Sequence, residues 1–194
     1  YVDAGNTSHP TFSNRLSFLC SLPPAATAAI QVLLASCLLA LVAQVKISLS
    51  FTPIPLTLQT IAVMGIGALL GSRLVALATL AYLAQGGLGL PVFAGGNLGL
   101  LYFFGPTGGY LVGFVVQAFV VGWFFERRPS LSLLQKWGIF FFATLLQLSL
   151  GALWLTKFMG WSHAISQGIF PFLVGDALKA ALLAACLPAK NRAY

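Results

Sequence analysis

The chain has 194 residues, of which 59% are hydrophobic and only 7% are charged. A soluble domain of this length carries roughly a quarter charged residues, so most of this surface must face hydrocarbon. The formal net charge of +7 does not indicate a nucleic-acid-binding protein, because the sequence has no basic run and no basic patch with interleaved aromatics. The composition is that of an integral membrane protein.

Polarity divides the chain into three parts. Residues 1–23 are polar and aperiodic, which predicts a flexible N-terminal tail, and residues 189–194 form a short basic tail. Residues 24–188 predict a transmembrane domain, since a bilayer span needs about 20 mostly apolar residues and Pro, Gly and charges mark its ends. The predicted fold is all-α, a bundle of six transmembrane helices at residues 24–45, 56–70, 74–90, 108–125, 137–157 and 170–187.

The first predicted helix carries small residues at helical spacing, namely Ala25, Ala29, Ser36 and Ala40. Small residues at this spacing let helices approach closely. They indicate either ordinary packing within the bundle, which is the more common case, or a surface that docks a partner. Four polar residues follow near the outer ends of the first two helices, where they either line a cavity or meet lipid headgroups: Gln44, Lys46, Thr57 and Gln59.

An uncharged stretch, residues 86–110, joins the third and fourth predicted helices. Its glycines and prolines favour turns, and its aromatic residues offer flat apolar surface. It is either a lid over an outer cavity or a segment that packs at the membrane interface, where aromatics commonly gather. Asn97, in its middle, has an amide that matches a urea-like ligand edge, but Asn is also common in turns for backbone reasons.

Asp176 is the only acidic residue inside the hydrophobic segments, and Lys179 follows it one helical turn later. Ionisable groups at membrane depth are costly and seldom face lipid, so the two predict a buried polar site. Three roles are open: a structural ion pair, a proton or ion relay, and a ligand-binding site. Binding is favoured over a relay, because no further titratable groups lie inward of the pair.

The distribution of basic residues predicts the topology. With the N-terminus in the cytoplasm, only Lys46 and Lys157 face outward, as the positive-inside rule requires. Both termini are then cytoplasmic, in a multi-pass protein of the plasma (inner) membrane. The cytoplasmic side holds Arg15, Arg73, Arg127, Arg128, Lys136, Lys190 and Arg192.

Enzymatic motifs are missing from the sequence. The histidines and cysteines have no metal-ligand spacing, and neither a P-loop nor a nucleophile elbow occurs. We therefore expect no catalytic residue, no metal and no cofactor. The longest polar stretch between spans, residues 126–136, is too short for a nucleotide-binding domain. Any ATP-driven function must depend on another chain.

Four motifs occur in order along the chain: T-P-I-P-L-T-L-Q-T, L-G-L-P-V-F-A-G-G, G-P-T-G-G-Y-L-V-G-F and P-F-L-V-G-D-A-L-K-A. Together they resemble the BioY family, the biotin-specific substrate-binding (S) component of energy-coupling-factor (ECF) transporters. The resemblance covers roughly residues 25–188. It implies a six-helix substrate-binding domain, at residues 24–188, that captures biotin with high affinity from the extracytoplasmic side. It also implies three partners, an ECF transmembrane coupling subunit and two ATPase subunits, which drive uptake.

The resemblance further implies which residues bind the ligand and the partners. Asp176 and Lys179 would contact the polar groups of biotin, with Asn97 beside them. The apolar ring of biotin would lie against Tyr82, Phe93 or Tyr110. The coupling subunit would dock through Ala25 and Ala29, with Ser36 and Ala40 as a relaxed continuation of the same pattern.

Two other classes of function remain open at this point. A structural membrane protein would bind no small molecule. A stand-alone carrier, dimeric through its small-residue faces, would move biotin or a related vitamin without partner ATPases. Uptake into vesicles with and without partner proteins separates these possibilities.

Overall fold

The computed structural model describes residues 23–128 and 130–187, and this part of the chain is mostly helical. The predicted tails, residues 1–23 and 189–194, lie outside it apart from Pro23. The helices are α2 (Pro24–Ala43), α3 (Gln59–Leu70), α4 (Ser72–Gly87), α5 (Leu100–Phe104), α6 (Gly108–Arg127), α7 (Leu133–Gly168) and α8 (Phe170–Cys186). Two short antiparallel strands, β1 (Lys46–Ile47) and β2 (Leu56–Thr57), join α2 to α3.

Several predicted boundaries differ from the observed ones, and two of the differences are the most informative. The second segment does not begin as helix at residue 56, because Leu56 and Thr57 pair with β1 and α3 begins at Gln59. The fifth does not end at Lys157, because α7 continues to Gly168 through a kink at Gly160. Gly160 has a φ of +75°, which glycine adopts without steric cost. The helix is therefore kinked at this residue and continues after it.

Three helices of the described residues are long and apolar enough to cross a bilayer: α2, α6 and α7. Large apolar side chains on the outside of the bundle support a membrane location. On α2, Leu33, Leu34 and Leu41 are 57%, 66% and 70% exposed. Such exposure is unusual for leucine in water but is ordinary where the surroundings are hydrocarbon. The structure is therefore that of a helical membrane protein with several apolar helices.

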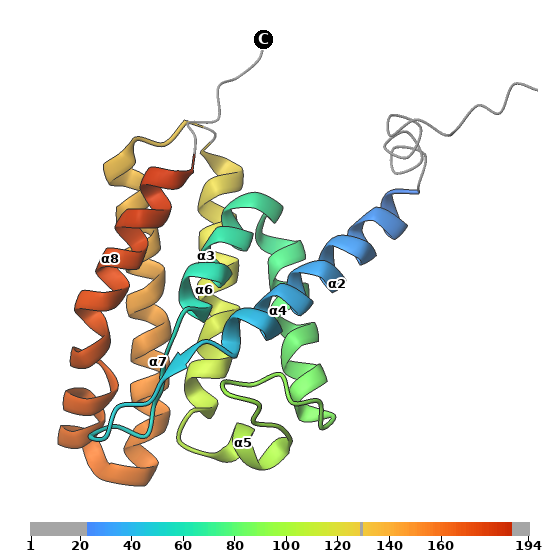
Figure 1. Cartoon of the computed structure of the whole chain (residues 1–194). Helices are drawn as coiled ribbons and strands as arrows, with labels where there is room; N and C mark the ends of the chain where they lie inside the picture. The colour runs from blue at the N-terminus through green and yellow to red at the C-terminus, as the bar shows by residue number, and fades with distance from the viewer. Residues whose placement is uncertain (1–22, 129, 188–194) are drawn as a thin grey trace, which may run out of the picture.

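The helices pack around α6, which contacts α3, α4 and α7, while α8 packs against α7 and α3. In Figure 1, the start of α2 and the end of α8 lie at one end of the bundle, together with the α3–α4 and α6–α7 connections. The strands, α5 and the α7–α8 connection lie at the other end. The first turns of α2 project obliquely beyond the other helices.

The α3–α4 turn is fastened to the end of α6. The backbone N–H of Ser72 donates to Glu126 Oε1 at 3.0 Å, and Ser72 Oγ donates to Glu126 Oε2 at 2.6 Å. A carboxylate suits this place, because the first N–H groups of α4 have no partner within the helix and carry a partial positive charge. Gly122 allows the approach: a Cβ there would lie 2.4 Å from Ser72 N. Arg73 and Arg127 lie at this same end.

Candidate functional site

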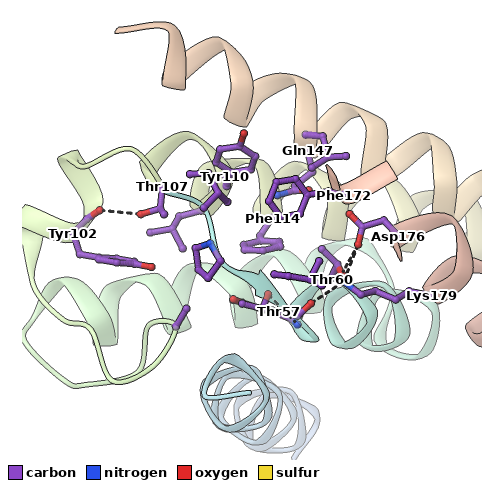
Figure 2. A pocket seen from close by; sticks show the side chains of 17 residues that line it. Thr57, Thr60, Tyr102, Thr107, Tyr110, Phe114, Gln147, Phe172, Asp176 and Lys179 are labelled. Atoms are coloured by element: carbon purple, nitrogen blue, oxygen red, sulfur yellow. Dashed lines mark hydrogen bonds and ion pairs between the residues drawn. The ribbon is translucent and has the colours of Figure 1, made fainter. Parts of the chain in front are cut away.

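A cavity lies among α3, α6, α7 and α8, with walls completed by residues 54–57 and by the segment between α4 and α6. It contains about 530 Å³ of space between atoms, part of which is open to solvent. Polar residues cluster at one end of it in Figure 2, Tyr102 and Thr107 lie at the other, and aromatic side chains lie between. Its lining is Ile54, Pro55, Leu56, Thr57, Gln59, Thr60, Ala94, Tyr102, Thr107, Tyr110, Leu111, Phe114, Gln147, Leu148, Phe172, Asp176 and Lys179.

Asp176 and Lys179 form an ion pair at the polar end of the cavity. Lys179 Nζ lies 2.8 Å from Asp176 Oδ1, and the two side chains are 12% and 2% exposed. The same ammonium donates to the Thr57 carbonyl at 2.7 Å and to Thr60 Oγ1 at 3.1 Å. An ammonium has three N–H donors, so these bonds use all of them. Lys179 therefore holds α8 against the start of α3 (Figure 2).

The carboxylate of Asp176 retains unused acceptor capacity. Its Oδ1 accepts from Lys179 and, at 3.3 Å, from Thr60 Oγ1, whereas no residue in the described ranges donates to Oδ2. Breaking a buried pair by removing one partner costs about 3–5 kcal/mol, because the remaining charge is uncompensated. The pair is thus both a structural contact and an acceptor site open to a ligand.

Two amide side chains add polar atoms to the cavity wall. Gln59 and Gln147 are each 2% exposed, and Gln59 Nε2 and Gln147 Oε1 have no hydrogen-bond partner among the described residues. A buried donor or acceptor without a partner costs about 1–3 kcal/mol, so each such atom in a native structure needs an explanation.

Aromatic side chains form the middle of the cavity and the end opposite the ion pair. Tyr110, Phe114 and Phe172 lie between the ion pair and Tyr102 (Figure 2). The Tyr110 hydroxyl donates to the Gly168 carbonyl at 2.8 Å, which fixes the ring. Burial raises the pKa of Tyr102 above its ordinary value. This surface suits a flat, apolar ring.

The structure separates the predicted ligand-binding residues into two groups. Asp176, Lys179 and Tyr110 line the cavity, but Tyr82 and Phe93 do not. Phe93 stacks on Tyr102 with ring centroids 5.2 Å apart, and Tyr82 meets Phe93 edge-on at 5.7 Å. Tyr82 and Phe93 thus form a layer behind the cavity wall. Of the three aromatic residues predicted to meet a ligand ring, Tyr110 is the one that lines the cavity, and a ligand contact with any of them stays a prediction.

Asn97 lies outside this cavity and instead stabilises its own turn. Its side-chain amide donates to the Ala94 carbonyl at 2.8 Å, and its backbone carbonyl accepts from the Phe93 N–H at 3.0 Å. The backbone interpretation of Asn97 therefore describes this structure. The residue also lines a second cavity, so a ligand contact there remains a prediction.

The second cavity adjoins the first, because Pro55, Tyr102 and Thr107 line both. It contains about 790 Å³ of space, open to solvent in part, and Lys46 is the one charged residue in its lining. Lys46 has no ion-pair partner within residues 23–128 and 130–187. The two cavities therefore share part of one wall, with Lys46 in the lining of the second and the Asp176–Lys179 pair in the lining of the first.

The four small residues predicted on α2 fall into two groups that differ in burial. Ala25 and Ala29 are exposed on the projecting first turns, where a partner can reach them. Ser36 is fully buried, donates to the Leu33 carbonyl at 2.9 Å and accepts from Gln85 Nε2 at 3.1 Å. Ala40 packs against the core. Ser36 and Ala40 therefore take part in packing within the bundle, and their role in docking a partner stays a prediction.

Three further lining residues were not among the predicted site residues: Thr60, Gln147 and Thr107. Thr60 and Gln147 are polar residues within apolar helices, and that mismatch is the signal that identifies them. Polar residues in apolar helices do not by themselves identify a ligand site. Gln117 of α6 and Thr144 of α7 are also such residues, and they hydrogen-bond to each other at 2.9 Å outside the cavity. Thr57 and Gln59 line the cavity. Of the two roles open to them, lining a cavity or meeting lipid headgroups, the structure therefore favours the first.

Comparison with known proteins gives consistent results. The probable biotin transporter BioY of Pyrococcus horikoshii is 39% identical over 136 residues, which are 70% of this chain and 80% of that protein. The biotin transporter BioY2 of Lactococcus lactis subsp. cremoris is 37% identical over 132 residues, 67% of this chain and 72% of that protein. Each of these relatives is named as a transporter.

The fold has a solved counterpart. The crystal structure, at 2.1 Å, of the S component for biotin from an ECF-type ABC transporter superposes with a TM-score of 0.77 at 25% identity. The alignment covers 85% of this chain and 92% of that one. The model of the BioY family matches residues 13–194. Because that model covers nearly the whole chain and the relatives align over most of their own length, the chain belongs to the BioY family.

Proposed function

We propose that this protein captures biotin from the extracytoplasmic side of the plasma membrane as the S component of an ECF transporter. The observation that carries the proposal is the cavity built around the buried Asp176–Lys179 pair in a member of the BioY family. The proposal includes six transmembrane helices with both termini in the cytoplasm. The grouping of Arg73, Arg127 and Arg128 at the end opposite the cavity supports that orientation.

The parts of biotin correspond to the parts of the cavity. Biotin has a ureido ring, an apolar thioether ring and a chain that ends in a carboxylate. The ureido group suits the polar end at Asp176, and the fused rings suit the surface of Tyr110, Phe114 and Phe172. The carboxylate then extends toward the outer cavity and Lys46. This orientation keeps the ligand's negative charge away from Asp176.

Uptake requires energy from partner chains. The sequence has no P-loop, and the connections between the helices are short, so a nucleotide must be bound elsewhere. We propose a transmembrane coupling subunit and two ATPase subunits as partners. The exposed Ala25 and Ala29 on the projecting start of α2 are the residues that we assign to docking the coupling subunit, since small residues allow close helix approach.

Two experiments test the proposed function. Calorimetry on the purified protein in detergent should detect tight binding of biotin and none of riboflavin or thiamine. Vesicles that contain the protein alone should retain biotin without accumulating it, whereas addition of the coupling and ATPase subunits with ATP should produce uptake. Accumulation by the protein alone would instead establish a stand-alone carrier, and failure of a folded protein to bind biotin would refute the proposal.

We expect Lys46→Gln to weaken biotin binding about fivefold, because an ion pair at a solvent-accessible site contributes roughly 1 kcal/mol. Calorimetry with biotin and with biotin methyl ester measures the effect: the original protein should prefer biotin, and the variant should bind both alike. Lys157→Gln is the matched control. Lys157 also lies at the outer end, but its ammonium is over the Trp154 ring, 3.8 Å from the centroid, and it lines neither cavity. An unchanged preference for biotin in Lys46→Gln would contradict the assignment.

A further inference from the structure

A groove on the surface of the bundle, the α6–α7 groove, runs beside the end of α6 and the start of α7, opposite the ligand cavity (Figure 1). It contains about 540 Å³ of space between atoms, part of which is open. Its walls include Phe124 and Arg128 from the end of α6 and Gln135, Gly138, Ile139 and Phe142 from α7. No residue of this groove lines the ligand cavity, so it is a separate feature of the fold.

The α6–α7 groove is polar at one end and apolar along its length. Its α7 residues are spaced i, i+3, i+4 and i+7, so they lie on one face of that helix. Gln135 is the first of them, and Phe142 is the last, about 10 Å further along the helix axis. Arg128, which directly follows α6, lies near the start of α7 and therefore at the Gln135 end. The groove thus has a polar mouth followed by an apolar channel.

Arg128 is the basic residue in the lining of the groove, and the described structure does not use its charge. The guanidinium of the neighbouring Arg127 lies over the Trp123 ring, 4.2 Å from its centroid. Lys136 is buried, and its ammonium donates to the Leu187 carbonyl at 2.6 Å. Arg128 is exposed and forms no ion pair with any residue in 23–128 or 130–187. Its charge is therefore available to an anion at the mouth of the groove.

Gln135 and Gly138 leave donors and space inside the groove. The side-chain carbonyl of Gln135 accepts from the Ser132 N–H at 3.0 Å, so its NH₂ group is the part that remains for a ligand. Glycine inside a helix is less favourable than alanine, and close approach of another segment commonly explains it. Nothing lies within 4 Å of the position that a Cβ on Gly138 would take. The missing side chain instead adds to the open space of the groove.

We propose that the α6–α7 groove binds an anionic phospholipid, with its phosphate at Arg128 and the Gln135 amide and an acyl chain over Gly138 toward Phe142. The order of polar and apolar surface in the groove is that of a phospholipid, and a guanidinium is well suited to a phosphate. Basic residues at the membrane surface also attract anionic headgroups. The groove is distinct from the ligand cavity, so this inference goes beyond the proposed function and does not require it.

A second copy of this chain matches the groove less well. It would have to offer a carboxylate to Arg128, and the acidic residues of the described ranges are Glu126 and Asp176. Both are already engaged, since Glu126 binds Ser72 and Asp176 is buried against Lys179. A membrane lipid supplies the negative charge that the described surface lacks. The charges therefore favour lipid as the occupant.

Native mass spectrometry of the purified protein, titrated with lipid in detergent, tests the headgroup contact. Phosphatidylglycerol should bind at least fivefold more tightly than phosphatidylcholine with the same acyl chains. Arg128→Gln should weaken phosphatidylglycerol about fivefold, the usual effect of one basic residue at an anionic membrane surface, and should remove the preference. Arg73→Gln is the matched control: Arg73 is also exposed at this end but does not line the groove, so affinity should stay within twofold.

Gly138→Leu tests the acyl-chain contact in the same titration. The added side chain should fill the groove and weaken phosphatidylglycerol at least fivefold. It should not lower the melting temperature in detergent alone, because a Cβ at this position meets nothing within 4 Å. Gly175→Leu is the matched control, since Gly175 of α8 has equally open space at its Cβ position and does not line the groove. Its affinity for the lipid should stay within twofold.

Three results would overturn the inference. Equal affinity of the original protein for the two lipids would remove the headgroup contact, and equal losses in Arg73→Gln and Arg128→Gln would indicate diffuse attraction by the basic surface. Unchanged phosphatidylglycerol affinity in folded Gly138→Leu would exclude an acyl chain from the groove. If Gly138→Leu also turned a dimer of the original protein into a monomer, with lipid affinity unchanged, the occupant would be a second copy.

Discussion

Asp176→Asn is expected to weaken biotin binding by at least tenfold while leaving much of the protein folded. The amide has one carbonyl oxygen and no charge, so it cannot satisfy both Lys179 and a ligand N–H as the carboxylate does. A hydrogen bond to a charged group contributes about 1.5–3 kcal/mol, which corresponds to at least tenfold in affinity. Calorimetry on the purified variant, with a thermal melt to establish folding, measures the effect.

Glu126→Gln is the control for Asp176→Asn. It neutralises the carboxylate that binds Ser72 at the opposite end of the bundle, so it should reduce the melting temperature and leave biotin affinity unchanged. Near-identical affinities of the original protein and a folded Asp176→Asn variant would remove Asp176 from the ligand site. The ion pair would then have only its structural role, which is to hold α8 to α3.

Gly122→Ala is expected to destabilise the protein by roughly 3 kcal/mol, because overpacking at a close helix contact forces the backbone apart. The added Cβ would lie 2.4 Å from Ser72 N and 2.6 Å from the Gly71 carbonyl carbon, both main-chain atoms that cannot rotate away. Separation of α6 from the α3–α4 turn would also break the bonds between Ser72 and Glu126. Thermal unfolding in detergent should show a clear loss in melting temperature.

Gly138→Ala is the matched substitution, and it should act in the opposite direction. Gly138 is on α7, and a Cβ there would meet nothing within 4 Å. Alanine in a helix is favoured over glycine by up to about 1 kcal/mol, so this variant should be as stable as the original protein or slightly more so. Equal melting temperatures of the two variants would show that the α6 contact tolerates expansion.

Local patterns in the sequence predicted the parts of this structure that depend on local physics. Apolar runs located the helices, and the three-residue spacing of Asp176 and Lys179 placed both on one face of α8. Exceptions arose where distant segments interact. Leu56 and Thr57 pair with β1, so α3 begins after them. The residues around Leu56 and Thr57 contain no pattern that predicts this pairing.

The polar end of the cavity is predictable only in part for the same reason. Thr57, Thr60 and Gln147 reach the ion pair or its surroundings because α3, α7 and α8 pack together, which their own sequences do not reveal. Phe93 was an apt candidate by composition, but Tyr102 covers it. Residue type thus indicated the chemistry of the site, and tertiary packing decided which side chains line it.

The three bonds of Lys179 make the position of residues 54–57 and the state of the Asp176 carboxylate thermodynamically linked. A ligand that draws on the charge of Asp176 changes how strongly the ammonium holds the Thr57 carbonyl. By reciprocity, any force that displaces this segment from α8 must change the affinity for the ligand by the same free energy. A neighbouring chain that shifts α3 would therefore alter occupancy of the cavity without touching it.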